Sequence, residues 1–244
     1  MNSKTTSMLA VAIAVAFSAS AATAANRPIS ATAASPVARH PAPSGSFALL
    51  FDQTGSPALS GVVVTKSLDA GSEPYDAEMA DDFVVPAGGW AVSQVKVGTF
   101  YQNGGTPVNP STSGNITFYS GVAVGPPGAP VAGCSYSNVP LTYDSGLSIS
   151  TLTLPTACAL PAGTFWIGFS ANLSFAAQGG DAYASQQNTT ANNVPVWRNP
   201  GDAYQTGCTS FSALTTCGFA TNGGMTVQLL GQTTPVTLQK FSVD

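Results

Sequence analysis

The chain has 244 residues, of which 44% are hydrophobic and only 7% are charged, and its formal net charge at pH 7 is −4. A mildly acidic chain without a stripe of lysine and arginine lacks the electrostatic attraction that nucleic acids and anionic lipid surfaces require. The composition therefore excludes both classes of partner, while the length is sufficient to bury a sizeable core.

Residues 1–24 have the pattern of a secretory signal peptide. Lys4 precedes an apolar run from Met8 to Phe17, and small residues end the segment at Ala24. The apolar run is shorter than the roughly 20 residues that a membrane-spanning helix needs, and no later apolar segment approaches that length. We therefore expect a secreted or periplasmic protein without membrane insertion.

Residues 25–46 are rich in proline, alanine and serine and contain few large apolar side chains. Such a segment does not bury enough surface to offset the entropy lost on ordering. The composition predicts a disordered spacer here, followed by a single domain over residues 47–244.

The rest of the chain has the pattern of short β-strands separated by turn residues. Apolar and β-branched runs lie at 46–51, 61–66, 81–86, 90–101, 115–121, 147–154, 164–175, 194–198, 225–231 and 236–243. Without a helical period, this pattern predicts an all-β fold, an antiparallel β-sandwich similar to a jelly roll. Residues 178–224 contain one short run only, and we expect a long loop there.

The four cysteines form an even set, which in an exported chain indicates disulfides in preference to metal ligands. Three pairings are possible. We predict the local one, Cys134 with Cys158 and Cys208 with Cys217, because each bridge then closes a short loop among turn residues. The Cys208–Cys217 bridge would constrain the long loop over residues 178–224.

Five stretches resemble a recurrent, uncharacterised family of secreted bacterial β-sandwich domains with an ADDFxVP motif. They are FDQTG at 51–55, ADDFVVPAGGW at 80–90, ITFYSG at 116–121, GPPGAPV at 125–131 and LPAGTFWIGFSANL at 160–173. The resemblance covers nearly the whole chain after the signal peptide. It implies a β-sandwich fold and export, and it carries over no catalytic residue.

Six of the eleven acidic residues gather between positions 69 and 82. A calcium ion would relieve their repulsion, with Asp69, Asp76, Asp81 and Asp82 as candidate ligands, and no other cofactor is indicated. In the alternative that we favour, Asp81 and Asp82 accept hydrogen bonds from backbone N–H groups and fix a corner of the sheet. At least one of these two should be buried, because both faces of their strand are apolar.

Alternation along the run 164–175 places Phe165, Ile167 and Phe169 on one face, which we assign to the core. Trp166 shares the other face with small and polar residues, which is typical of a carbohydrate platform. The candidate ligand-binding residues are Trp166, Trp197, Arg198, Asn172, Tyr119, Tyr183 and Tyr204. In the alternative that we favour, Trp166 packs beneath the long loop against Trp197 or a disulfide and closes a second, smaller core.

Catalysis is not expected. The sole histidine, His40, lies in the predicted spacer, so no Ser-His-Asp or Cys-His pair forms within the domain. Asp181 and Asp202 are the one carboxylate pair that could converge, and we interpret both as turn residues. The sequence thus predicts an exported, non-catalytic module that binds extracellular polysaccharide. The alternative is a structural or surface protein without a dedicated ligand, and a glycan hydrolase is the least favoured hypothesis.

Overall fold

The structure is a computed structural model that describes residues 27–33, 47–121, 125–190, 192–220 and 223–234. The predicted signal peptide, His40 and the predicted strand at 236–243 lie outside the described residues. No helix within the described ranges is long and apolar enough to cross a membrane.

The described residues form fifteen strands, one short α-helix and two 3-10 turns. They are β1 (Ser30–Thr32), β2 (Ala48–Gln53), β3 (Pro57–Val63), β4 (Thr65–Ser67), η1 (Glu73–Tyr75), β5 (Glu78–Val85), β6 (Trp90–Asn103), β7 (Thr106–Pro107), β8 (Ser113–Ser120), β9 (Pro130–Asp144), β10 (Ile149–Leu160), β11 (Gly163–Leu173), α1 (Phe175–Gln178), β12 (Asp181–Gln187), β13 (Val196–Arg198), β14 (Ser212–Ala213), η2 (Leu214–Cys217) and β15 (Val227–Thr233).

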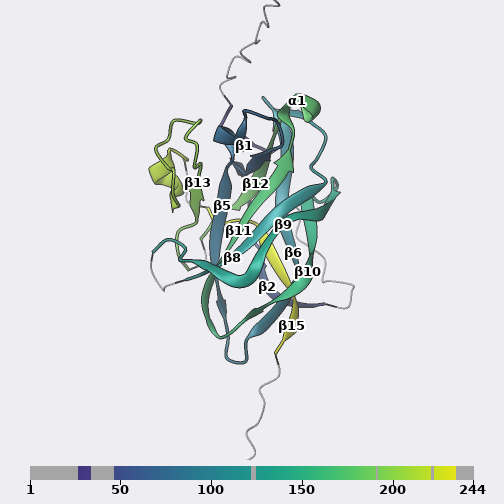
Figure 1. The fold of residues 1–244 in the computed structure, drawn as a ribbon, viewed down its shortest axis with the longest axis vertical. Coiled ribbons are helices and arrows are strands. Elements are labelled where there is room, and N and C mark those ends of the chain that lie inside the picture. Colours follow the sequence, from purple (N-terminus) through teal and green to yellow (C-terminus); the bar gives the residue numbers. More distant parts are fainter. Residues whose placement is uncertain (1–26, 34–46, 122–124, 191, 221–222, 235–244) are drawn as a thin grey trace, which may run out of the picture.

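The strands are hydrogen-bonded in the order β1-β3-β12-β6-β10-β9-β8-β11-β5-β13-β14, with β2, β4, β7 and β15 attached beside this path. The result is one large antiparallel sheet curled into a half-barrel (Figure 1), in which β4 pairs with β11 in parallel. The all-β, antiparallel prediction is confirmed, whereas a jelly-roll strand order is not confirmed.

The concave side of the curled sheet encloses the main core. Phe83 lies in its centre, with its ring 5.8 to 6.3 Å from the rings of Phe51, Trp90, Phe118 and Phe165. Burying a ring of this size contributes roughly 1.5–3 kcal/mol relative to leaving it in water. The apolar residues of β5, β8 and β11 therefore fix which side of these strands faces inward and leave the opposite side for other groups.

The prediction of a disordered spacer over 25–46 is wrong for residues 27–33. Strand β1 pairs with β3, and the Arg27 guanidinium lies over the rings of Phe175 at 4.0 Å and Tyr75 at 4.5 Å. This segment is ordered by backbone pairing and cation–π contacts, which composition does not report. Residues 34–46 lie outside the described residues.

The prediction of a long loop over 178–224 is also wrong in part. Strand β12 lies within it, pairs with β3 on one side and β6 on the other, and is buried along its whole length. Its sequence, DAYASQQ, lacks the apolar alternation that marks a strand, and the backbone ladders to β3 and β6 order it instead. Both predicted disulfides, Cys134–Cys158 and Cys208–Cys217, are confirmed.

Candidate functional site

The two faces of β11 differ as its alternation predicts. Phe165, Ile167 and Phe169 belong to the main core, and Trp166 belongs to a separate small cluster on the opposite face. This opposite face of β5, β8 and β11 is bordered by residues 193–213, whose strands β13 and β14 extend the sheet beyond β5, and which are called the covering segment below.

Trp166 is fully buried, so the exposed carbohydrate platform predicted for this ring is wrong. It packs with Ala80 and Tyr119 from the sheet and with Val196 and Phe211 from the covering segment. The favoured alternative is confirmed in that Trp166 lies in a second, smaller core, which includes residues of the long segment. Trp197 has no part in this small core, contrary to the expected contact.

Three other aromatic candidates are structural. Trp197 is fully buried in the main core and donates from Nε1 to the carbonyl oxygen of Val63 at 2.8 Å. Tyr183 is buried and stacks on Phe100. Tyr204 packs against Trp197 with its ring centre 6.0 Å away. Trp197 and Tyr183 are therefore closed to a ligand, and Tyr204 is half-buried with its ring against Trp197.

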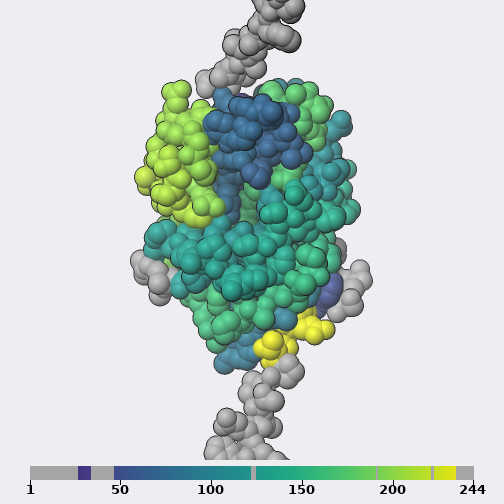
Figure 2. Space-filling view, in the orientation of Figure 1, coloured from purple at the N-terminus to yellow at the C-terminus, as the bar shows by residue number. Residues whose placement is uncertain are grey.

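Beside the covering segment, the outer face of the sheet is hollowed into a cleft of about 250 Å³. Figure 2 shows the hollow between the blue segment with β4 and η1, the yellow-green covering segment and the teal strands β8 and β9. The cleft is lined by Lys66, Asp76, Ala77, Glu78, Asn115, Thr117, Tyr119, Ser137, Ser170, Arg198 and Pro200.

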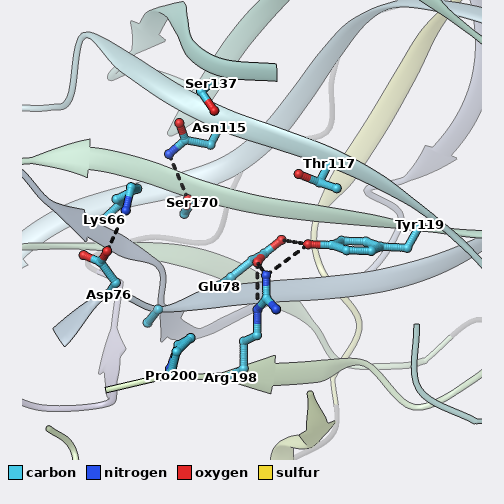
Figure 3. A pocket seen from close by; sticks show the side chains of 11 residues that line it. Lys66, Asp76, Glu78, Asn115, Thr117, Tyr119, Ser137, Ser170, Arg198 and Pro200 are labelled. Atoms are coloured by element: carbon cyan, nitrogen blue, oxygen red, sulfur yellow. Dashed lines mark hydrogen bonds and ion pairs between the residues drawn. The ribbon is translucent and has the colours of Figure 1, made fainter. Parts of the chain in front are cut away.

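Arg198 forms one end of the cleft and is held by three neighbours, two of which, Glu78 and Tyr119, are seen beside it in Figure 3. Its Nε and Nη2 donate to Oε2 of Glu78 at 3.0 and 2.5 Å, and Nη2 also donates to the Tyr119 hydroxyl at 3.2 Å. The guanidinium lies 4.3 Å from the centre of the Phe211 ring. Within the part of the chain that the structure describes, Nη1 of Arg198 donates no hydrogen bond. Arg198 is therefore fixed in place with two N–H donors left over for a ligand.

Glu78 completes this group by accepting a 2.8 Å hydrogen bond from the Tyr119 hydroxyl. Burial, together with the negative charge of Glu78, raises the pKa of Tyr119, so the phenol stays protonated as a donor. Gly168 on β11 makes room for the pair, because a Cβ atom there would overlap Oε1 of Glu78 and lie 2.9 Å from the Tyr119 ring. The small residues that share a face of β11 with Trp166 thus leave room for the ion pair between Glu78 and Arg198.

The other end of the cleft carries a second ion pair, between Lys66 and Asp76 (Figure 3). Nζ of Lys66 lies 2.6 Å from Oδ2 of Asp76, and the backbone N–H of Ser67 donates to Oδ1 at 2.7 Å. The two cations and two carboxylates that line the cleft are thus arranged as two neutral pairs.

The floor between the two ends is a network of amides and hydroxyls. Asn115 donates to Oγ of Ser170 at 3.0 Å and to Oδ1 of Asn172 at 2.7 Å. Asn172 is buried and donates to Ser113 and Asn138. Because its amide is fully engaged, Asn172 supports Asn115 and Ser170 and does not itself line the cleft.

The four candidate calcium ligands are not brought together. Asp69 accepts from the hydroxyl of Ser174 and from the backbone N–H of Ala176, at the start of α1, and Asp76 pairs with Lys66. Partial burial tends to raise the pKa of Asp69, but these hydrogen bonds outweigh it and lower the pKa below its usual value. Among the described residues, no group of three or more side chains is placed to hold a metal ion. The four side chains therefore do not form one ligand set in this arrangement.

Asp81 and Asp82 are both buried and accept backbone hydrogen bonds, as the favoured alternative predicts. Asp81 accepts from the backbone N–H groups of Asp82 and Met225 and from the side chain of Gln53. Asp82 accepts from the backbone and side chain of Asn193. The main donors come from distant segments and not from the neighbouring acidic loop, so the pair joins separate parts of the chain.

Asp181 and Asp202 have unrelated partners. Asp181 begins β12, is buried and lies 3.4 Å from Nη1 of Arg27, so its interpretation as a turn residue is wrong. Asp202 has a positive φ of 48° and accepts from the backbone N–H of Gly207, which confirms it as a turn residue.

Of the residues that line the cleft, Arg198 and Tyr119 were predicted from the sequence to bind a ligand. Asp76 was predicted as a calcium ligand. Sequence reasoning missed Lys66, Glu78, Thr117 and Ser137, which lie on four different strands. The one usable signal was alternation, since Thr117 shares a strand face with Tyr119 and Asn115. Lys66 and Glu78 carried no such signal because their distance from Arg198 depends on strand order.

The fold and the cleft together define an all-β, disulfide-bonded protein with a polar cleft on one face of its sheet. Comparison of the chain with models of protein families, with curated proteins and with solved structures gave no match.

Proposed function

We propose that the protein is an exported, non-catalytic module that binds neutral extracellular carbohydrate in the cleft between Arg198 and Lys66. The observation that carries the proposal is the fixed Arg198 guanidinium, whose Nη1 donors are unused among the described residues while Glu78 and Tyr119 hold the rest. A positioned donor of this kind loses little conformational entropy when a ligand binds.

The charge balance supports a neutral ligand. Arg198 is paired with Glu78 and Lys66 with Asp76, so the cleft has no excess charge to attract an anion or a cation. Hydroxyl groups both donate and accept hydrogen bonds, and the cleft offers both functions through its amides, hydroxyls, carboxylates and cations. A molecule with many hydroxyl groups therefore matches this lining.

Binding is favoured over hydrolysis for a related reason. Glycoside hydrolysis requires one carboxyl group that stays protonated as a general acid. Both carboxylates that line the cleft are held by a cation, Glu78 by Arg198 and Asp76 by Lys66, so neither is a free carboxyl group that faces a bound sugar. Export is supported by the two disulfides, which are consistent with an oxidising compartment.

Isothermal titration calorimetry with a panel of neutral and acidic polysaccharides tests the proposal. We expect a neutral polysaccharide to bind the wild type and to bind at least about 10-fold more weakly to Arg198→Lys, which keeps the charge but loses the planar fork. Lys96→Arg, an equally charge-conserving exchange on β6 outside the cleft, serves as the control. Absence of binding to every polysaccharide would contradict the proposal and favour a structural role.

A further inference from the structure

The cleft continues past Arg198 into a second hollow of about 530 Å³. Three residues, Thr117, Tyr119 and Arg198, line both spaces, so the two lie side by side on the outer face of the sheet and are together called the trough below. Figure 3 shows Thr117 and Tyr119 side by side at the end of the cleft where Arg198 lies. A ligand long enough to pass Arg198 enters the second hollow without leaving the surface of the protein.

The two spaces differ in chemistry. The cleft is lined by both ion pairs, whereas the second hollow has Arg198 as its one charged lining residue and adds Pro126, Pro127, Pro130 and Phe211 to the shared Thr117 and Tyr119. Flat apolar groups suit the C–H faces of sugar rings, and fixed polar groups suit their hydroxyl edges. Ser135 and Ser210 add hydroxyl groups to the second hollow, and they add no charge.

We infer that the trough binds an extended neutral oligosaccharide chain, with one part recognised by the charged groups of the cleft and the following units lying over the prolines and Phe211. This inference rests on the proposed carbohydrate binding and adds the class of ligand, a polymer and not a single sugar. Units in the second hollow add contacts to a chain already held in the cleft, so affinity increases with chain length.

Strand β9 provides a matched pair of positions for a test. Ser135 and Ser137 are both exposed and lie two residues apart, and therefore on the same face of the strand. Ser137 lines the cleft and Ser135 lines the second hollow, where its Cα atom is paired with that of Thr117 across to β8. A tryptophan at either position fills one space and leaves the lining of the other intact.

The experiment measures affinities of the wild type, Ser135→Trp and Ser137→Trp for cello-, malto- and xylo-oligosaccharides of two and six units, after thermal melts show that each variant is folded. For the series that binds, we expect the wild type to prefer six units over two by at least about 10-fold. Ser135→Trp is expected to bind two units as the wild type does and to lose the preference for six. Ser137→Trp is expected to bind neither length.

Each result has a distinct meaning. Equal wild-type affinity for two and six units would overturn the inference and leave the proposed carbohydrate binding intact. Loss of binding to two units in Ser135→Trp would also overturn it, because the second hollow would then belong to the primary site. If no length of any series binds, both the inference and the proposed function are overturned.

Discussion

The backbone N–H of Met225 donates a 2.6 Å hydrogen bond to Oδ2 of Asp81, a residue 144 positions earlier in the chain. The same oxygen accepts from the side chain of Gln53 at 2.5 Å, and Gln53 also donates to the carbonyl oxygen of Met225 at 3.0 Å. These contacts join β5, the end of β2 and the segment before β15. The carboxylate therefore fixes a junction between strands that are distant in sequence.

Replacing Asp81 by alanine should lower stability, because the buried N–H of Met225 loses its acceptor. An unsatisfied buried donor costs about 1–3 kcal/mol, which corresponds to a Tm lower by about 3–10 °C for a domain of this size. Differential scanning calorimetry measures the change. Asp144→Ala, which removes an exposed turn carboxylate, is the control and should change Tm less. An unchanged Tm in Asp81→Ala would contradict the structural role.

Stability should fall as pH rises from about 4 to about 7. Burial raises the pKa of Asp81 from 3.8 to about 7, against the opposing effect of its hydrogen bonds. A folded pKa above the unfolded value means that the folded state holds a proton that the unfolded state releases in this window. The free energy of unfolding then decreases with pH by at most about 1.4 kcal/mol per unit and levels off above pH 7.

Denaturant unfolding at a series of pH values checks this dependence. Asp81→Asn does not titrate at this position, so the difference in slope between the wild type and the variant isolates the contribution of Asp81. Burial also raises the pKa of Asp82 and of Asp181, which gives the remaining slope the same sign. Identical slopes for wild type and variant would show that Asp81 is ionised throughout.

Calcium should have no effect on the melting temperature of the wild type. Asp81 and Asp82 use their oxygens for separate protein donors, Met225 and Asn193 among them, and have no shared ligand position. Thermal melts with excess calcium and with a chelator measure the effect. A Tm lowered by chelator in the wild type, and unchanged by it in Asp82→Ala, would instead assign a metal to this region.

Gly168→Ala should displace Glu78 and Tyr119, the two hydrogen-bond partners of Arg198. The added Cβ would overlap Oε1 of Glu78 and press on the Tyr119 ring, so Glu78 must move away from its partners. Such overpacking costs about 1–3 kcal/mol. We expect lower stability together with loss of carbohydrate binding. Gly55→Ala, whose Cβ would meet nothing within 4 Å, is the matched control and should change stability by less than about 0.5 kcal/mol. Wild-type binding by Gly168→Ala would contradict this arrangement of the site.

The sequence was sufficient for the features that depend on local pattern. Alternation placed Phe165 and Trp166 on opposite faces of β11, and turn residues separated the strands. The short sequence separations of 24 and 9 residues favoured the disulfide pairing that the structure has. Two adjacent carboxylates in an apolar strand indicated buried acceptors, because a charge there requires partners.

The sequence did not predict those strands that are stabilised mainly by pairing with their neighbours. Strand β12 is buried between β3 and β6 although its own residues are mostly small or polar, and β1 is ordered by pairing with β3. Propensity describes a segment by itself, whereas a central strand is stabilised by ladders on both sides. No local pattern in DAYASQQ distinguishes it from a turn-rich loop.

Two outcomes were decided by tertiary structure alone. Alternation left both exposure and burial open for Trp166, with burial favoured, and its contacts with Val196 and Phe211 decided for burial. Glu78 and Arg198 are 120 positions apart, and they meet because β13 pairs with β5 in a register that sets Arg198 opposite Glu78. Alternation along a strand specifies which face a side chain occupies, but strand order and register determine what lies beside it, and those depend on contacts across the whole sheet.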